Sequence, residues 1–175
     1  MQILPNKLAK DERDNVRIGL DKSGDAYSWM QICPRFKIDR EGDRILSNAE
    51  VYLRVAERGS EYVHIAMKEP ALGSMKEVNC SLETTSWKLS IYQSSLDTLD
   101  KGVLLSSQLI YIHDPETKCY LTIEQEQADV MQDDGLAAEE PYPPKIVLSP
   151  SSQNYIDTNY LWVIECNSQY HGAVS

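Results

Sequence analysis

Short alternating apolar–polar runs that recur in a fixed order constrain this chain more than any other feature. All three tryptophans begin such a run (Trp29, Trp87 and Trp162). Between them lie two tyrosine-led hairpins, over residues 52–65 and 111–123, whose tyrosines are separated by ten and nine residues. Alternation with period two, punctuated by Gly, Pro, Asn, Asp and Ser, is typical of strands joined by turns. The sequence therefore predicts an all-β protein.

The order of these units amounts to about two and a half copies of a four-strand repeat. A short strand and a polar loop precede each tryptophan (strands 16–20, 77–80 and 146–148). Three such copies form a β-trefoil, in which each copy gives one hairpin to a barrel and one to its cap. A third hairpin would have to precede Val16, and residues 1–13 carry too little apolar pattern to supply it. We expect the tryptophans and tyrosines to pack in the core.

Composition excludes several classes of partner. The 175 residues contain 17 Lys plus Arg against 27 Asp plus Glu, a net charge of −10, which disfavours nucleic acid as a partner. No apolar run reaches the length of a membrane span, so we expect no membrane insertion, and the first residues do not resemble a signal peptide. The four cysteines are far apart in sequence, which indicates free thiols in a reducing compartment and no metal site.

The segment 124–140 differs from the rest of the chain. It carries seven acidic residues and no basic one, and it continues into Pro141-Tyr-Pro-Pro144. This composition predicts a long acidic loop over residues 124–144 between two strands. A Ca²⁺ site is the alternative, but the ligand pattern of an EF-hand loop is absent.

No enzyme motif is present, and we expect no catalytic residue and no cofactor. His64 and His113 occupy strand positions and His171 lies near the C-terminus, so each is expected to be a surface or half-buried side chain rather than a general base.

Several of these strings, in this order, resemble a known family. Glu77-Val-Asn-Cys80 followed by Thr85-Ser-Trp-Lys88 resembles the end of the first β-trefoil of inositol trisphosphate receptors. Residues 4–37 and 51–65 resemble the stretches upstream of it, and residues 111–123 with Leu161-Trp162 resemble the first repeat of the second trefoil. Repeats of this kind, shared with ryanodine receptors, are called MIR domains. The resemblance implies that residues 1–95 are the C-terminal part of one trefoil and residues 96–175 the first repeat of a second. The alternative is one degenerate trefoil.

The resemblance also implies where a ligand would bind. In the receptors, the loop after the strand matching 146–148 grips inositol trisphosphate with two arginines. Here that place holds Ser149, Ser151, Ser152 and Gln153, with Pro150 between them. Guanidinium groups are what a dense anion demands, and both are missing. We expect at most a degenerate phosphate loop and no high-affinity inositol trisphosphate site.

A second loop of the family passes gating signals between subunits. Residues 34–42 match it, with Phe36 where the receptors carry a tyrosine. The loop is basic on an acidic chain (Arg35, Lys37 and Arg40), which suits an electrostatic contact. A solvated turn with one buried Phe is the alternative.

Two functions follow. The chain is expected to be a cytosolic regulatory module at the cytosolic face of the endoplasmic reticulum, contacting neighbouring domains or subunits of a homo-oligomeric, tetrameric calcium-release channel. The alternative is a stand-alone MIR-type trefoil that binds protein or carbohydrate. Open barrel edges expose unpaired backbone groups, so a fragment of a trefoil is expected to be poorly stable alone or to have its edge covered by another chain.

Overall fold

A computed structural model describes residues 1–20, 25–36, 40, 42–69, 75–92, 102–124, 145–150 and 160–165. Within these ranges there are eleven strands and one 3₁₀-helix: β1 (Gln2–Leu8), β2 (Val16–Gly19), η1 (Ala26–Ser28), β3 (Met30–Pro34), β4 (Ala49–Val55), β5 (Tyr62–Ile65), β6 (Lys76–Ser81), β7 (Trp87–Ile91), β8 (Leu109–His113), β9 (Cys119–Glu124), β10 (Lys145–Pro150) and β11 (Leu161–Val163). None of the helical structure in these ranges is long and apolar enough to cross a membrane. The all-β prediction is confirmed.

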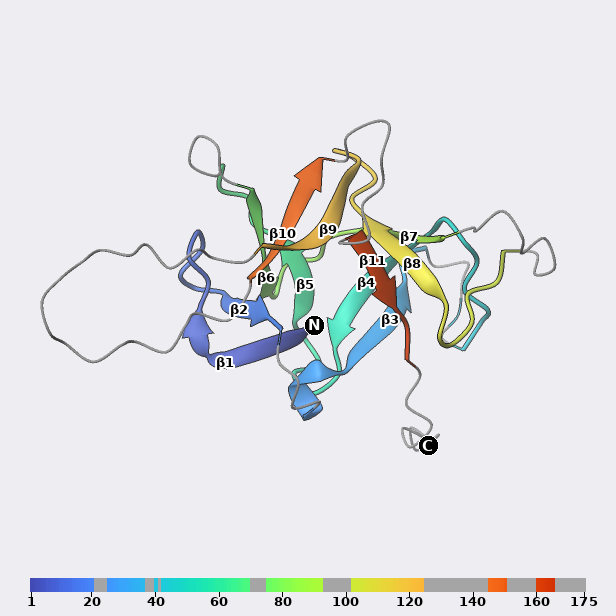
Figure 1. Ribbon diagram of the computed structural model, residues 1–175. Helices are drawn as coiled ribbons and strands as arrows, with labels where there is room; N and C mark the ends of the chain where they lie inside the picture. The colour runs from blue at the N-terminus through green and yellow to red at the C-terminus, as the bar shows by residue number, and fades with distance from the viewer. Residues whose placement is uncertain are drawn as a thin grey trace, which may run out of the picture.

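Five strands form the wall of a barrel (Figure 1). They pair in the order β3–β4–β7–β8–β11, and every pair is antiparallel. Val51 of β4 lies opposite Trp87 of β7, and Ile110 of β8 lies opposite Trp162 of β11. The tryptophan-led strands of the second and third copies therefore occupy equivalent places in the barrel.

Three hairpins form the cap: β1–β2, β5–β6 and β9–β10. Their second strands meet each other, since β2 pairs with β6, β6 with β10, and β10 with β2. These are the three short strands that the sequence places before the tryptophans. Their mutual pairing gives the cap a pseudo-threefold arrangement, and the predicted β-trefoil fold is confirmed.

The two tyrosine hairpins occupy equivalent places, as predicted. Arg54 of β4 lies opposite Tyr62 of β5, as His113 of β8 lies opposite Tyr120 of β9. The Tyr52–Tyr62 and Tyr111–Tyr120 rings meet edge to face, with centroids 6.2 and 5.6 Å apart. Each pair joins the barrel to its cap hairpin.

Residues 1–13 were predicted to supply no third hairpin, and among the described residues they supply only one strand of it, the cap strand β1. β1 pairs with β2, and Ile3 lies opposite Ile18. The strand has little apolar pattern because its second half, from Pro5 to Leu8, is exposed and its register shifts between Leu4 and Leu8. Ile3, completely buried, holds the place that Val63 and Leu121 hold in the other two hairpins.

Strands from before and after residue 95 share one sheet, since β7 pairs with β8 and β6 with β10. The first and second strands of a copy are present twice, as β3–β4 and β7–β8. For the third copy, the described residues supply β11 as first strand and β1–β2 as cap hairpin, but no second strand. The division of the chain at about residue 95 stays a prediction.

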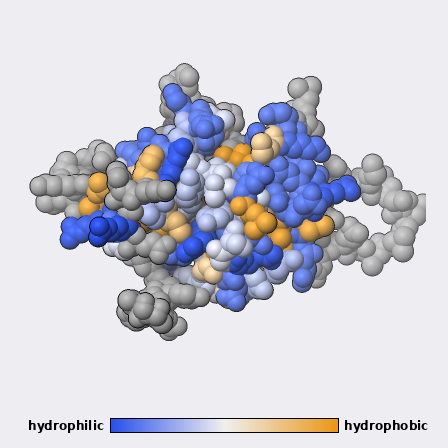
Figure 2. All heavy atoms as spheres, turned by 180° about the vertical axis from the view of Figure 1, so that it is seen from behind, coloured by the Kyte–Doolittle hydropathy of each residue, from blue (hydrophilic) through white to orange (hydrophobic). Residues whose placement is uncertain are grey.

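The core fills the space between barrel and cap. Its largest completely buried side chains include Trp87, Leu89 and Ile146. Cys33 and Cys80 are buried free thiols, as expected, and Cys119 is half-buried. Figure 2 shows that the face behind that of Figure 1 is mainly hydrophilic, with hydrophobic residues in small separate groups.

Candidate contact site at the β3–β4 connection

The predicted contact loop begins where β3 ends, and Arg35 fixes its start. The Arg35 guanidinium forms an ion pair with Glu50 of β4 and donates a 2.9 Å hydrogen bond to the Ser86 hydroxyl. The Arg35 N–H also donates to the Glu50 carbonyl at 3.4 Å. The charge of Arg35 is thus partly neutralised, and its side chain holds the loop against the barrel.

Phe36 is the apolar feature of this loop. Half of its surface (50%) is exposed, and the Arg35 guanidinium carbon lies 5.4 Å from the centre of its ring. A cation over an aromatic face is attracted by the ring electrons, so Arg35 orients the ring. An exposed, oriented aromatic side chain is typical of a contact residue.

Arg40 is the first residue of a tight turn that ends at Asp43. The Arg40 N–H donates to the Asp43 carboxylate at 2.8 Å, and the Asp43 N–H donates to the Arg40 carbonyl at 3.1 Å. Gly42 lies inside this turn at φ +93°, a backbone conformation that residues with a Cβ rarely adopt. Arg40 and Arg44 are both exposed on either side of it.

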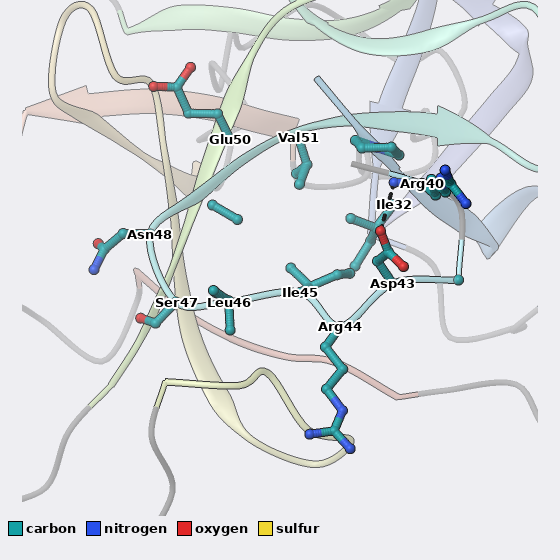
Figure 3. Close-up of a pocket in the computed structure, with 13 residues that line it drawn as sticks. Ile32, Arg40, Asp43, Arg44, Ile45, Leu46, Ser47, Asn48, Glu50 and Val51 are labelled. Carbon is teal, nitrogen blue, oxygen red and sulfur yellow. Dashed lines mark hydrogen bonds between the residues drawn. The ribbon is translucent and has the colours of Figure 1, made fainter. Parts of the chain in front are cut away.

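The turn borders a cavity of about 500 Å³ between the connection and β3–β4 (Figure 3). Ile32, Ile45 and Val51 point into its centre, whereas Arg44 and Glu50 point away from it (Figure 3). The cavity therefore has aliphatic side chains at its centre and a lining that is polar as well as apolar. Such a shape accepts an apolar side chain of a partner and surrounds it with polar contacts.

The far side of the connection is anchored to residues beyond β7. Leu46 forms a β-bridge with Val103, and the Leu104 N–H donates to the Ile45 carbonyl at 2.8 Å. The Ile91 N–H donates to the Ser47 hydroxyl at 3.1 Å. A partner that displaces this connection would therefore also displace the β7–β8 region.

The remaining predicted site residues are only partly described. Of the phosphate loop, Ser149 is buried on β10, and its hydroxyl lies 3.2 Å from the Tyr160 hydroxyl. Ser151, Ser152 and Gln153 lie outside the described residues, as do Lys37 of the contact loop and residues 125–144 of the acidic loop. Their predicted roles stay predictions.

Sequence reasoning missed a polar network beneath the cap. The Glu12 carboxylate accepts hydrogen bonds from the Asn15 and Asn79 side-chain amides at 2.8 and 2.9 Å, and from the Met67 N–H at 2.7 Å. Burial acts to raise the pKa of Glu12, but these bonds and the nearby His64 outweigh it and lower that pKa. Only Asn79, between the apolar Val78 and Cys80, hinted at such a network in the sequence.

His64 lies at the edge of this network and is 5% exposed. Its Nδ1 is 2.9 Å from the Thr85 hydroxyl, which also accepts from the Ile65 N–H. Its Nε2 lies 3.7 Å from Glu83 and 4.0 Å from Glu12. Burial lowers the pKa of His64, and the two carboxylates act against that.

A second buried carboxylate ties the β1–β2 turn to β6. Glu77 is 2% exposed and accepts hydrogen bonds from the N–H groups of Lys10 and Asp11, at 3.0 and 2.7 Å. The carboxylates of Glu12 and Glu77 thus accept hydrogen bonds from backbone N–H groups or side-chain amides, and these bonds give both residues a structural role.

Comparison with known proteins gives one family and a common fold. Residues 1–98 match the family described as inositol 1,4,5-trisphosphate/ryanodine receptor. The fold is similar to that of an SDF2-like protein from Arabidopsis thaliana, with a TM-score of 0.66 and 14% identity, over 93% of this chain and 83% of that one. It is also similar to a Caenorhabditis elegans protein of unknown function, with a TM-score of 0.62 and 16% identity, over 94% and 85% of the two chains. At these identities the two structures support the fold alone.

Proposed function

Because the chain belongs to the inositol 1,4,5-trisphosphate/ryanodine receptor family, we propose that it is a non-enzymatic regulatory module that acts by contacting other proteins. The observation that carries the proposal is the construction of the β3–β4 connection. An oriented, half-exposed Phe36 and an exposed Arg40 stand beside a cavity with aliphatic side chains at its centre. The partner is a neighbouring domain or subunit of a calcium-release channel at the cytosolic face of the endoplasmic reticulum.

The mechanism is a rigid-body contact. Ion pairing at Arg35 and the bridge from Leu46 to Val103 fix both ends of the connection to the barrel. Force applied at Phe36 is therefore passed through the adjacent Arg35 to Glu50 of β4 and to Ser86, next to β7. Displacement of packed modules against one another is a common way of transmitting gating signals.

Photocrosslinking tests this contact in cells. A benzophenone amino acid at position 36 is expected to crosslink to a large channel polypeptide that sediments with internal membranes. Leu82 offers a matched control, because it is 71% exposed and lies outside the connection. Equal crosslinking from positions 36 and 82, or none from 36, would contradict the contact.

We propose further that the module does not bind inositol trisphosphate tightly. In support, residues 149–153 contain no arginine, and the Ser149 hydroxyl is engaged with Tyr160. Isothermal titration with inositol 1,4,5-trisphosphate is expected to give no saturable binding in the micromolar range. A saturable exothermic signal would sink this part of the proposal.

The alternative is a stand-alone trefoil that binds protein or carbohydrate. One observation favours it: strands from both sides of residue 95 join a single sheet. An immunoblot of the endogenous protein separates the two functions. A band far above 19.9 kDa supports the channel module, and a soluble band of about that mass supports the stand-alone protein.

A further inference from the structure

The short connection between β6 and β7, residues 82–86, joins a buried histidine to the contact loop. The Thr85 hydroxyl lies 2.9 Å from Nδ1 of His64. The next residue, Ser86, accepts a 2.9 Å hydrogen bond from the guanidinium of Arg35, where the contact loop begins. Two consecutive residues of one connection therefore contact the histidine and the loop.

Charged groups from three other parts of the fold act on His64. Glu12 of the β1–β2 turn and Glu83 of the β6–β7 connection lie 4.0 and 3.7 Å from its Nε2. Lys76 of β6 acts on it from a greater distance and opposes a positive charge there. Both carboxylate distances exceed the length of a charge-assisted hydrogen bond, about 2.7–2.9 Å. A charged His64 can therefore draw a carboxylate closer.

The two carboxylates differ in their freedom to move. Glu12 is held by hydrogen bonds from two side-chain amides and one backbone N–H, and its side chain is 19% exposed. The side chain of Glu83 is 63% exposed. A cavity of about 320 Å³, lined in part by residues 84–86, gives the connection room to shift. Glu83 is therefore the carboxylate that moves, and the connection moves with it.

A proton on His64 acts on the connection at two neighbouring residues. A charged imidazole donates from both ring nitrogens, so Nε2 attracts Glu83 and Nδ1 donates to the Thr85 hydroxyl. The bond from Arg35 to Ser86 is already at the preferred length of an N–H···O hydrogen bond. A shift of the connection therefore weakens that bond.

We propose that protonation of His64 loosens the contact loop and so weakens the contact that Phe36 makes with a partner. Glu83 is drawn toward the charged ring, and Arg35 loses its bond to Ser86. Arg35 orients the Phe36 ring, so the ring is held less firmly. Protonation of a buried histidine is a common way to change an interface. The regulatory meaning of this coupling rests on the proposed function of Phe36, but the coupling itself does not.

The pH range of the effect follows from the surroundings of His64. Burial lowers its pKa from the ordinary value of 6.5, and Lys76 acts in the same direction. Glu12 and Glu83 act against them. His64 is therefore neutral at about pH 7.5 and gains its proton as the pH falls below 6.5. Ordinary Asp and Glu side chains titrate near pH 4, so they stay charged over most of this range.

Fluorine NMR tests the coupling with the full chain. Phe36 is the only phenylalanine in the sequence, so 4-fluorophenylalanine incorporated in place of phenylalanine gives one ¹⁹F resonance, from the contact loop. This resonance is expected to shift as the pH is lowered from about 7.5 to about 5. Proton NMR of the His64 ring in the same sample measures its titration directly. Equal midpoints for the two signals are expected, because one proton causes both changes.

Three variants identify the route, and circular dichroism checks that each is folded. His64→Gln keeps a polar side chain that can bond to Thr85 but cannot gain a charge, so the ¹⁹F shift should be lost. In Ser86→Ala the His64 ring should still titrate, but the ¹⁹F resonance should not follow it. His113→Gln is the matched control, because it removes another half-buried histidine and should leave the ¹⁹F titration unchanged.

A ¹⁹F resonance that does not move in the wild type, or that moves equally in His64→Gln, would overturn the coupling. A titration that persists in Ser86→Ala would overturn the route through Arg35. Crosslinking from position 36 in isolated membranes is expected to be weaker at about pH 5.5 than at pH 7.5, and equal at both in His64→Gln. Crosslinking that is independent of pH contradicts the regulation alone. No crosslinking at either pH contradicts the proposed function, so the two proposals fail in distinguishable ways.

Discussion

The indole Nε1 of Trp87 donates a 2.9 Å hydrogen bond to the carbonyl oxygen of Val63, and both residues are completely buried. Trp162 repeats this bond in the next copy, where its Nε1 donates to the Leu121 carbonyl at 3.0 Å. The same contact thus locks a barrel strand to a cap hairpin twice. The two sites differ in one respect, since Trp162 borders a groove that Met1 and Ile32 also line.

Replacement of each tryptophan by phenylalanine should therefore have unequal effects. Trp87→Phe leaves the buried Val63 carbonyl without a donor and creates a small cavity, a loss of about 2–4 kcal/mol in the free energy of unfolding. Trp162→Phe should lose only about half as much, because Trp162 is half-exposed and water can replace the donor. Urea denaturation of both variants measures the difference. Equal losses would mean that the groove beside Trp162 is closed in solution.

The repeat was predictable because its equivalent strands show the same alternation of apolar and polar residues. Tyr52, Tyr62, Tyr111 and Tyr120 mark equivalent strands in the sequence as they do in the structure. β1 was not predictable, because a cap strand that buries little besides Ile3 leaves almost no periodic signal. The position of the tryptophan relative to its strand partner also differs by one residue between β3 and β7. Gln31, two residues after Trp29, lies opposite Arg54, whereas Lys88, one residue after Trp87, lies opposite the equivalent His113.

The candidate site was predictable only in part. Arg35, Phe36 and Arg40 were found through family resemblance and charge. The cavity beside them is lined by Ile45 and Val51, which lie outside residues 34–42. The groove beside Trp162 depends on which strands pair across the barrel, and no local sequence pattern encodes that pairing.

Two serines that precede tryptophans offer a matched test of hydrogen bonding. Ser86 accepts from Arg35 and donates to Glu50, so Ser86→Ala should lower the free energy of unfolding by about 1–2 kcal/mol. Ser28 has a buried hydroxyl with no partner among the described residues, so Ser28→Ala should be neutral or stabilise by up to about 1 kcal/mol. Thermal or urea denaturation distinguishes them. A loss at Ser28 as large as that at Ser86 would show that its hydroxyl is paired in solution.

Stability should decrease as the pH falls below 6.5. Burial lowers the pKa of His64 from its ordinary value of 6.5, so the unfolded chain binds this proton more tightly than the folded one. The stabilising effect of neutral His64 is complete above pH 6.5 and is lost as the pH falls through that value. Burial and Lys88 lower the pKa of His113 as well, so the two groups act in the same direction.

Below pH 4.5 the loss of stability should continue, because the pKa of Glu12 is also lowered in the folded state and its carboxylate becomes protonated there only at lower pH.

Urea midpoints measured between about pH 7.5 and pH 5 isolate the effect of the two histidines from that of Glu12. His64→Gln should flatten this profile, and the double variant with His113→Gln should flatten it further. A wild-type midpoint that does not change over this range would refute the assignment.

Gly42 should be the most sensitive position of the contact loop. Its φ of +93° lies in a region that a residue with a Cβ adopts only with strain, although nothing lies within 4 Å of the Cβ position. Gly42→Ala should therefore cost about 1 kcal/mol through the backbone alone, and it should reduce crosslinking from position 36 by reshaping the Arg40–Asp43 turn. Gly59→Ala, at φ +49° on another turn, controls for the stability loss without touching this loop. Equal crosslinking in the two variants would show that the turn does not set the position of Phe36.

Cysteine reactivity should separate the buried thiols from the half-buried one. Burial raises the pKa of the Cys80 thiol well above its usual range, and its Sγ lies 3.0 Å from the Glu61 carboxylate, which further disfavours a thiolate. Because the thiolate is the reactive form, Cys80 should resist alkylation in the native protein, while the less buried Cys119 is modified. Mass spectrometry of peptides after brief iodoacetamide treatment measures both sites in one sample. In urea the two should react alike, and rapid native modification of Cys80 would mean that the β5–β6 hairpin opens from the cap.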